Sequence, residues 1–302
     1  MPERHARYVE HRRSSPSARA AARRRGRLRR RRRLLAGGAL ALVAAVAVLV
    51  VLDITAVDAH GAHTIRYTID SRLTHRSLPQ VGVIPPGRSH GLRPLLVFLH
   101  GKSNGGESSN LNSQMYAALA RLGPRAPDIV FPNGGEDSYW HNRADGRWGD
   151  YVVDEVIPQA IRRLHADPRR VAIGGISMGG FGAYDIARLH PNRFCAVGGH
   201  SAALWRSGGE TAPGAFDDAE DFARHDVIGA AEAQNPYPHK PLWLDAGSDD
   251  PFRSADLDLA HELRSYGDDV SFHSWPGGHE GSYWRSHWNE YLGFYAKALA
   301  RC

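Results

Sequence analysis

Cysteine is scarce in this chain, which has only Cys195 and Cys302 among its 302 residues. Neither stands near the further Cys or His residues at short spacing that a zinc site requires, so no metal site is predicted. An apolar, strand-like stretch begins at Cys195, which indicates a buried thiol, and Cys302 is the last residue. A disulfide between them is permitted outside the cell, but this placement does not favour one.

Acidic residues are almost absent from the first part of the chain. Residues 1–33 contain 14 Arg against two Glu, whereas residues 34–302 contain 24 basic and 30 acidic residues, a net charge of −6. The pI of about 9.5 therefore comes from the N-terminal tail. Because the rest of the chain is acidic overall, we expect no nucleic-acid partner.

Charge is absent from residues 34–52, "LLAGGALALVAAVAVLVVL". As a helix this segment would span roughly 28 Å, about the hydrocarbon thickness of a bilayer. The arginines before it should stay in the cytoplasm. We favour an uncleaved signal anchor, which makes the membrane a partner. The alternative is a signal removed near Ala59, and the paired arginines before "LLAG" resemble those of a twin-arginine signal. Either outcome places residues 60–302 outside, on the membrane or secreted.

Residues 60–302 alternate between strand-like and helix-like segments and are expected to form one domain. Two half-exposed strands, "HTIRYTIDS" and "SLPQVGVIPPG", come first. Buried strands are then predicted at "PLLVFLHG", "DIVFPNGG", "RRVAIGG", "FCAVGG" and "KPLWLDAG". Strands that alternate with helices indicate an α/β fold with a mostly parallel sheet and helices on both faces.

Three details of this organisation are also predicted. Asp150 is a candidate N-cap for an amphipathic helix through "YVVDEVIPQAIRRL". A last helix is expected near residues 282–300. The looser segment 201–240, rich in Gly, Pro and Asp, is expected to be an insertion that shapes a pocket.

The stretch "GGISMGGFGAYDIARL" carries a serine where a strand becomes a helix. Gly175 and Gly179 permit a tight turn that projects Ser177 from the end of the sheet. Ser177 is therefore the predicted nucleophile. The backbone N–H of Met178, at the start of the helix, is a predicted donor to the oxyanion of a tetrahedral intermediate.

A serine nucleophile needs a base, and the base needs an orienting carboxylate. In this arrangement the chain order is Ser, acid, His. His279 follows a strand and two glycines and is the predicted base. Asp249 and Asp250 follow another strand and compete for the role of the acid, and we prefer Asp250 because it lies deeper in the loop. The N–H of Lys102, after an earlier central strand, is the predicted second oxyanion donor.

Four further residues are predicted to lie at the substrate: His100, Gly101, Trp140 and Trp284. For His100 the alternative role is to order the loop through hydrogen bonds. For the two tryptophans the alternative is packing in the core, since an aromatic ring with a polar tip suits either place.

With these residues in view, the chain resembles the esterase D family of α/β-hydrolases, which includes S-formylglutathione hydrolases, feruloyl esterases and mycolyltransferases. The matching stretches are "VFLHG", "SYWHNRADGRWGDYVVDEVIP", "IGGISMGGFGAYDIARLHPNRFCAV", "LDAGSDDPF" and "WPGGHEGSYW". The resemblance implies the α/β-hydrolase fold, a triad of Ser177, Asp250 and His279, and an oxyanion hole from Lys102 and Met178. The export segment departs from the cytosolic formylglutathione hydrolases, which puts that substrate in doubt.

The sequence therefore predicts an extracytoplasmic serine esterase that needs no cofactor and cleaves a small-molecule or cell-envelope ester. An acyltransferase acting on a cell-envelope sugar is the alternative within enzymes, because both reactions pass through an acyl-serine. A non-catalytic binding protein with the hydrolase fold is the alternative outside them, and intact Ser, Asp and His in the required order argue against it.

Overall fold

The structure is a computed structural model that describes residues 57–87, 91–102 and 106–302. The predicted tail at 1–33 and the apolar segment at 34–52 lie outside these residues. Within the described ranges, no helix is both long and apolar enough to cross a bilayer. Residues 57–302 form one compact unit.

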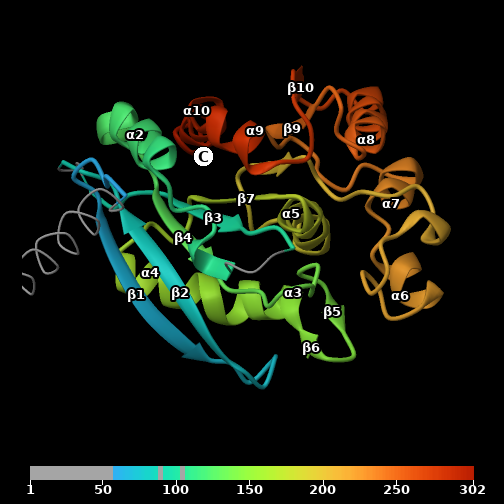
Figure 1. Ribbon diagram of the computed structural model, residues 1–302, viewed down its shortest axis with the longest axis horizontal. Coiled ribbons are helices and arrows are strands. Elements are labelled where there is room, and N and C mark those ends of the chain that lie inside the picture. Colours follow the sequence, from blue (N-terminus) through green and yellow to red (C-terminus); the bar gives the residue numbers. More distant parts are fainter. Residues whose placement is uncertain (1–56, 88–90, 103–105) are drawn as a thin grey trace, which may run out of the picture. The chain divides into compact units, whose positions relative to one another are not determined.

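An eight-stranded sheet runs through this unit in the order β1-β2-β4-β3-β7-β8-β9-β10 (Figure 1). Its strands are β1 (His63–Asp70), β2 (Ser77–Ile84), β3 (Leu95–Leu99), β4 (Asp128–Pro132), β7 (Val171–Ile176), β8 (Val197–His200), β9 (Leu242–Gly247) and β10 (Val270–Trp275). β2 pairs antiparallel with β1 and β4, and every other pairing within this eight-stranded sheet is parallel. The prediction of a mostly parallel sheet is confirmed.

Alternation along the central strands explains why helices cover both faces. In β3, Leu95, Val97 and Leu99 belong to one buried apolar cluster, whereas Leu96 and Phe98 belong to the other. Successive side chains of a strand point to opposite faces, so a strand that is apolar throughout needs cover on both sides.

The first of these clusters includes residues of α4 (Ile157–Leu164), α5 (Met178–Leu189), α7 (Val227–Ala233) and α8 (Arg253–Ser265). The second includes residues of α2 (Ser113–Leu122) and α10 (Trp288–Leu299). α2 and α10 lie side by side in Figure 1. The remaining short elements are η1 (Gly106–Ser108), η2 (Gly123–Arg125), β5 (Asn142–Arg143), β6 (Gly146–Arg147), η4 (Gly208–Glu210), α6 (Ala219–Arg224) and α9 (Gly281–Ser286).

Two helix boundaries differ from the prediction. The helix expected to begin at Asp150 already begins with α3 (Trp148–Asp150) and continues through a π-helical segment, Tyr151–Val156, into α4. Asp150 caps nothing; its carboxylate accepts hydrogen bonds from Asn142 and Arg147 instead. The last helix is divided at His287 into α9 and α10.

The cysteine prediction was wrong. Cys195 and Cys302 form a disulfide with 5.9 Å between their Cα atoms. Cys195 is half-buried and comes two residues before β8, and the packing of α10 returns the chain end to this place. Sequence position alone did not show that the last residue lies beside Cys195.

The segment 201–240 packs as an aromatic cluster. Trp205 and Phe216 contact each other and also Phe181 of α5 and Tyr139. None of its residues lines the pocket beside Ser177, so the segment does not form the wall of that pocket; it contacts the wall where Ser201 accepts a hydrogen bond from Trp284.

Candidate active site

Ser177 lies between β7 and α5 in a backbone conformation that few residues other than glycine adopt, with φ 55° and ψ −116°. Three backbone hydrogen bonds hold it there. Its N–H donates to the carbonyl of His200 at 2.9 Å, and its own carbonyl accepts from the N–H groups of Phe181 and Ala203. A strained residue that neighbouring elements hold so firmly is typical of a functional site.

The glycines on either side of Ser177 are needed because backbone passes close to backbone. A Cβ added at Gly175 would lie 2.5 Å from the carbonyl of Gly179 and 2.7 Å from the carbonyl oxygen of Leu99. A Cβ at Gly179 would collide with the same oxygen of Leu99. β3, β7 and α5 can meet at this bend only without side chains at these two positions.

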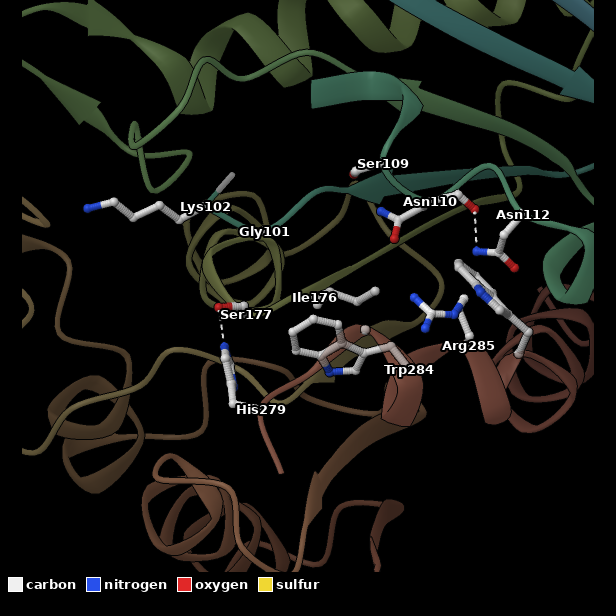
Figure 2. A pocket seen from close by; sticks show the side chains of 12 residues that line it. Gly101, Lys102, Ser109, Asn110, Asn112, Ile176, Ser177, His279, Trp284 and Arg285 are labelled. Atoms are coloured by element: carbon white, nitrogen blue, oxygen red, sulfur yellow. Dashed lines mark hydrogen bonds between the residues drawn. The ribbon is translucent and has the colours of Figure 1, made fainter. Parts of the chain in front are cut away.

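His279 and Asp250 approach Ser177 in a single line of hydrogen bonds. The Nε2 atom of His279 lies 2.8 Å from Oγ of Ser177, and its Nδ1 atom lies 2.9 Å from Oδ2 of Asp250. Figure 2 marks the hydrogen bond between His279 and Ser177. Because a carboxylate only accepts, Nδ1 carries the ring proton and Nε2 of the neutral ring is free to accept the Ser177 hydroxyl proton. The His279 side chain is 25% exposed and that of Asp250 is fully buried.

The surroundings of Asp250 favour its charged form. Burial alone would raise its pKa, but hydrogen bonds from His279, the N–H of Phe252 and the Ser201 hydroxyl outweigh burial, so the pKa of Asp250 is lowered. Asp249 is exposed, and its backbone N–H donates to the carbonyl of Gly277. The structure thus places Asp250, not Asp249, against the imidazole.

Ser201 is a residue of this site that the sequence reasoning missed. It directly follows β8, is fully buried and has a φ of 50°. Its hydroxyl helps to lower the pKa of Asp250 and accepts a hydrogen bond of 3.0 Å from the indole N–H of Trp284. The indole ring of Trp284 in turn meets the His279 ring edge to face, 5.0 Å between centroids. The available sequence signal for Ser201 was its position at the carboxyl end of β8, the strand beside β7.

The two predicted oxyanion donors are the backbone N–H groups of Met178 and Lys102, and their role stays a prediction. Met178 is the first residue of α5, and an N–H at this position has no carbonyl one turn earlier in the helix to bond. Lys102 follows β3 and lines the same pocket as Ser177.

A pocket of about 400 Å³ opens beside Ser177 and His279 (Figure 2). Its lining comes from the loop after β3, the end of β7, and α9 with the start of α10. The lining residues are Gly101, Lys102, Ser109, Asn110, Asn112, Ile176, Ser177, His279, Gly281, Trp284, Arg285 and Trp288. Gly101 and Trp284 thus lie at the place predicted for them, and Asn110 and Arg285 are additions.

His100 and Trp140 do not line this pocket, and their burial argues against the predicted contact with substrate. Trp140 is fully buried, and its indole N–H donates to the carbonyl of His100 at 3.1 Å. His100 accepts from the N–H of Gly134 through Nε2, so its Nδ1 donates to the carbonyl of Gly101. Burial lowers the pKa of His100, consistent with a neutral ring. Both residues order the loop after β3, the alternative role considered for His100.

The part of the chain that the structure describes contains no group of three or more His, Cys, Asp or Glu residues arranged to hold a metal ion. The hydrogen-bonded line at this site instead joins a hydroxyl nucleophile, Ser177, a base, His279, and a carboxylate, Asp250. This set supports acyl transfer.

Comparison with known proteins agrees with this geometry. Residues 76–295 match the model of the family described as Esterase. The chain belongs to this esterase family. Esterase Rv1288 of Mycobacterium tuberculosis is 27% identical over 246 residues, which cover 67% of this chain and 52% of that protein. The MPT51 antigen of Mycobacterium leprae is 30% identical over 93 residues, 30% of this chain and 31% of the antigen. The chain thus spans about half the length of the esterase it matches.

Solved structures show the same α/β-hydrolase fold. An S-formylglutathione hydrolase from Agrobacterium tumefaciens superposes with a TM-score of 0.67 at 17% identity, covering 79% of this chain and 96% of that one. A ferulic acid esterase superposes with a TM-score of 0.66 at 19% identity, covering 78% and 98%. At these identities the likeness shows the fold alone. The expected resemblance to the esterase D group is confirmed by the family match over residues 76–295.

Proposed function

We propose that this esterase-family chain hydrolyses carboxylic esters through an acyl-serine intermediate. His279 takes the hydroxyl proton of Ser177 through Nε2 while Oγ attacks the ester carbonyl carbon. The imidazolium then gives this proton to the departing alkoxide oxygen, and Asp250 stabilises the charge and keeps the ring in one tautomer. Water attacks the acyl-serine in the second half, with His279 again as base, which releases the acid and restores Ser177.

The developing oxyanion is stabilised by the backbone N–H groups of Met178 and Lys102. Fixed donors of this kind are among the largest contributions to acyl-transfer catalysis, about 2.7–4 kcal/mol for one donor. Because both roles belong to the backbone, they do not depend on the chemistry of the two side chains.

The unbroken line from Asp250 through His279 to Ser177, at 2.9 Å and 2.8 Å, carries this proposal. It joins loops that are 102 residues apart in the chain. The strained conformation of Ser177 and the pocket beside it support the same conclusion.

We further propose that the enzyme works outside the cytoplasm, on the membrane or secreted. Two observations support this location. The apolar segment 34–52 directly follows an arginine-rich tail. The Cys195–Cys302 disulfide suits an oxidising compartment, because cytosolic thiols are kept reduced.

Ser177→Ala tests the catalytic proposal. The variant should lower kcat/KM for 4-nitrophenyl acetate by on the order of 10³-fold or more, with an unchanged melting temperature, because it removes the nucleophile and leaves the fold intact. Turnover near the wild-type rate in the folded variant would refute the assignment. Product analysis of the wild-type enzyme with and without an added sugar then distinguishes hydrolysis from acyl transfer to a cell-envelope sugar.

A further inference from the structure

The guanidinium of Arg285 lies in the pocket beside Ser177 without an acidic partner. Arg285 is on α9, six residues after His279, and its side chain points toward the pocket interior beside Trp284 (Figure 2). Among the described residues no carboxylate lies within 4.0 Å of it, and none accepts a hydrogen bond from it. By contrast, Arg143 and Arg188 each pair with an aspartate.

A second group in the pocket is also available to a ligand. Asn110 is only 8% exposed, yet its side-chain amide makes no hydrogen bond with the described part of the chain. Figure 2 places this amide across the pocket from Arg285. Asn112 differs, because its amide is used for capping α2 through Met115 and for a bond to the carbonyl of Asn110.

The charge of the lining has one sign. Arg285 is the cation whose side chain points into the pocket, since that of Lys102 points away from it in Figure 2, and none of the twelve lining residues is Asp or Glu. This contrasts with the folded unit as a whole, because residues 57–302 carry five more acidic than basic residues. A positive pocket in an acidic molecule concentrates anionic ligands there rather than over the whole surface.

We propose that the substrate is an ester that carries a second, anionic group, a carboxylate, and that Arg285 binds this group. The proposal rests on the esterase function proposed above and adds the substrate class. A planar guanidinium offers two parallel N–H donors that match a carboxylate. The Asn110 amide donates to the same group or to a neighbouring oxygen, while Ile176 and Trp284 contact the apolar part between the anion and the ester.

The experiment uses two pairs of substrates, because the anion belongs either to the acyl part or to the alcohol part. In the acyl pair, 4-nitrophenyl monoglutarate is compared with 4-nitrophenyl valerate, in which a methyl group replaces the carboxylate. In the alcohol pair, 4-acetoxybenzoate is compared with 4-acetoxybenzamide. Within each pair the ratio of kcat/KM for the anionic over the neutral ester measures the preference for charge, and this ratio is determined for the wild type and for Arg285→Gln.

In at least one pair, Arg285→Gln should lower this ratio by on the order of tenfold, since one charged hydrogen bond is lost. Added salt should weaken the wild-type preference, because the pocket rim is exposed. Arg162→Gln is the matched control: it removes one exposed arginine charge from α4, outside the pocket, and should leave both ratios and the rates unchanged.

Ratios that are the same in wild type and Arg285→Gln for both pairs would overturn the anionic-substrate proposal. They would indicate a pocket for neutral groups, such as a sugar. If the folded wild-type enzyme hydrolyses none of the four esters, the esterase proposal itself fails, so the two failures are distinguishable.

Discussion

Two histidine–aspartate pairs lie at the carboxyl edge of the sheet, and only one of them faces a serine. In the pair His279–Asp250, the second ring nitrogen lies 2.8 Å from the Ser177 hydroxyl, and the His279 side chain is 25% exposed. In the pair His200–Asp245, the ring is fully buried and its second nitrogen lies 3.0 Å from the hydroxyl of Tyr295. The shorter hydrogen bond, 2.6 Å, belongs to the buried pair.

This difference shows that a short His–Asp bond does not by itself make a catalytic site. Asp245 also accepts hydrogen bonds from Trp243, Tyr283 and Tyr291, so its carboxylate is the centre of a closed network in the core. Burial, followed by the charge of Asp245, raises the pKa of Tyr291 well above its ordinary value, which keeps its proton in place. The pair His200–Asp245, fully buried, stabilises the core below the site. The pair His279–Asp250 has a partly exposed imidazole that contacts the nucleophile Ser177, and we call it the catalytic pair.

The largest loss of activity is expected when the catalytic pair His279–Asp250 is disrupted. Asp250→Asn should lower kcat for 4-nitrophenyl acetate by on the order of 10³- to 10⁴-fold, because an amide no longer fixes the reactive tautomer of His279 or stabilises the imidazolium. The melting temperature should change little. The same substitution at the exposed neighbour, Asp249→Asn, serves as the control, and equal losses for the two variants would contradict the assigned acid.

Breaking the buried pair should affect stability instead. In Asp245→Asn an amide N–H₂ group would face donors that the carboxylate now satisfies, and a disrupted buried pair costs about 3–5 kcal/mol of unfolding free energy. Urea unfolding measures this loss, and kcat per folded molecule should fall far less than in Asp250→Asn. A variant as stable as wild type, but inactive, would mean that the two pairs have been assigned the wrong roles.

The sequence predicted the catalytic residues Ser177, Asp250 and His279 better than the packing around them. The sequence signals for Ser177 and His279 lie in short local stretches: glycines at a strand-to-helix turn for Ser177, and a strand followed by two glycines for His279. The alternation of strands with helices and the cover on both faces of the sheet also followed from apolar runs. The disulfide, the burial of Trp140 and the placement of Arg285 did not follow, because each depends on how α9, α10 and the loop after β3 pack against segments distant in sequence.

A third buried carboxyl, Asp256, sharpens the comparison because it has no histidine. Its Oδ2 accepts from the N–H of Ala202 at 3.1 Å, and its Oδ1 has no partner among the described residues. Burial, together with the charges of Asp250 and Asp245, raises its pKa well above the usual 3.8. The folded protein therefore holds a proton here that the unfolded chain loses above about pH 4, and this contribution to stability declines as the pH rises.

The smallest of these effects is expected for Asp256→Asn. The amide mimics the protonated acid, so activity should be retained and the protein should be more stable than wild type at neutral pH. The difference in unfolding free energy should grow from pH 5 to pH 8, by at most about 1.4 kcal/mol per pH unit. Urea unfolding at the two values tests this, and a gap that is constant or larger at pH 5 would show that Asp256 is ionised in the folded protein.

Mapping the site of reaction with a fluorophosphonate probe tests the central claim most directly. Peptide mass analysis of the labelled protein should locate the adduct on Ser177, and the rate of labelling should fall by on the order of 10³-fold in His279→Gln while His200→Gln, measured on folded protein, retains most of it. An adduct on another residue, or labelling of Ser177 that is independent of His279, would contradict the account.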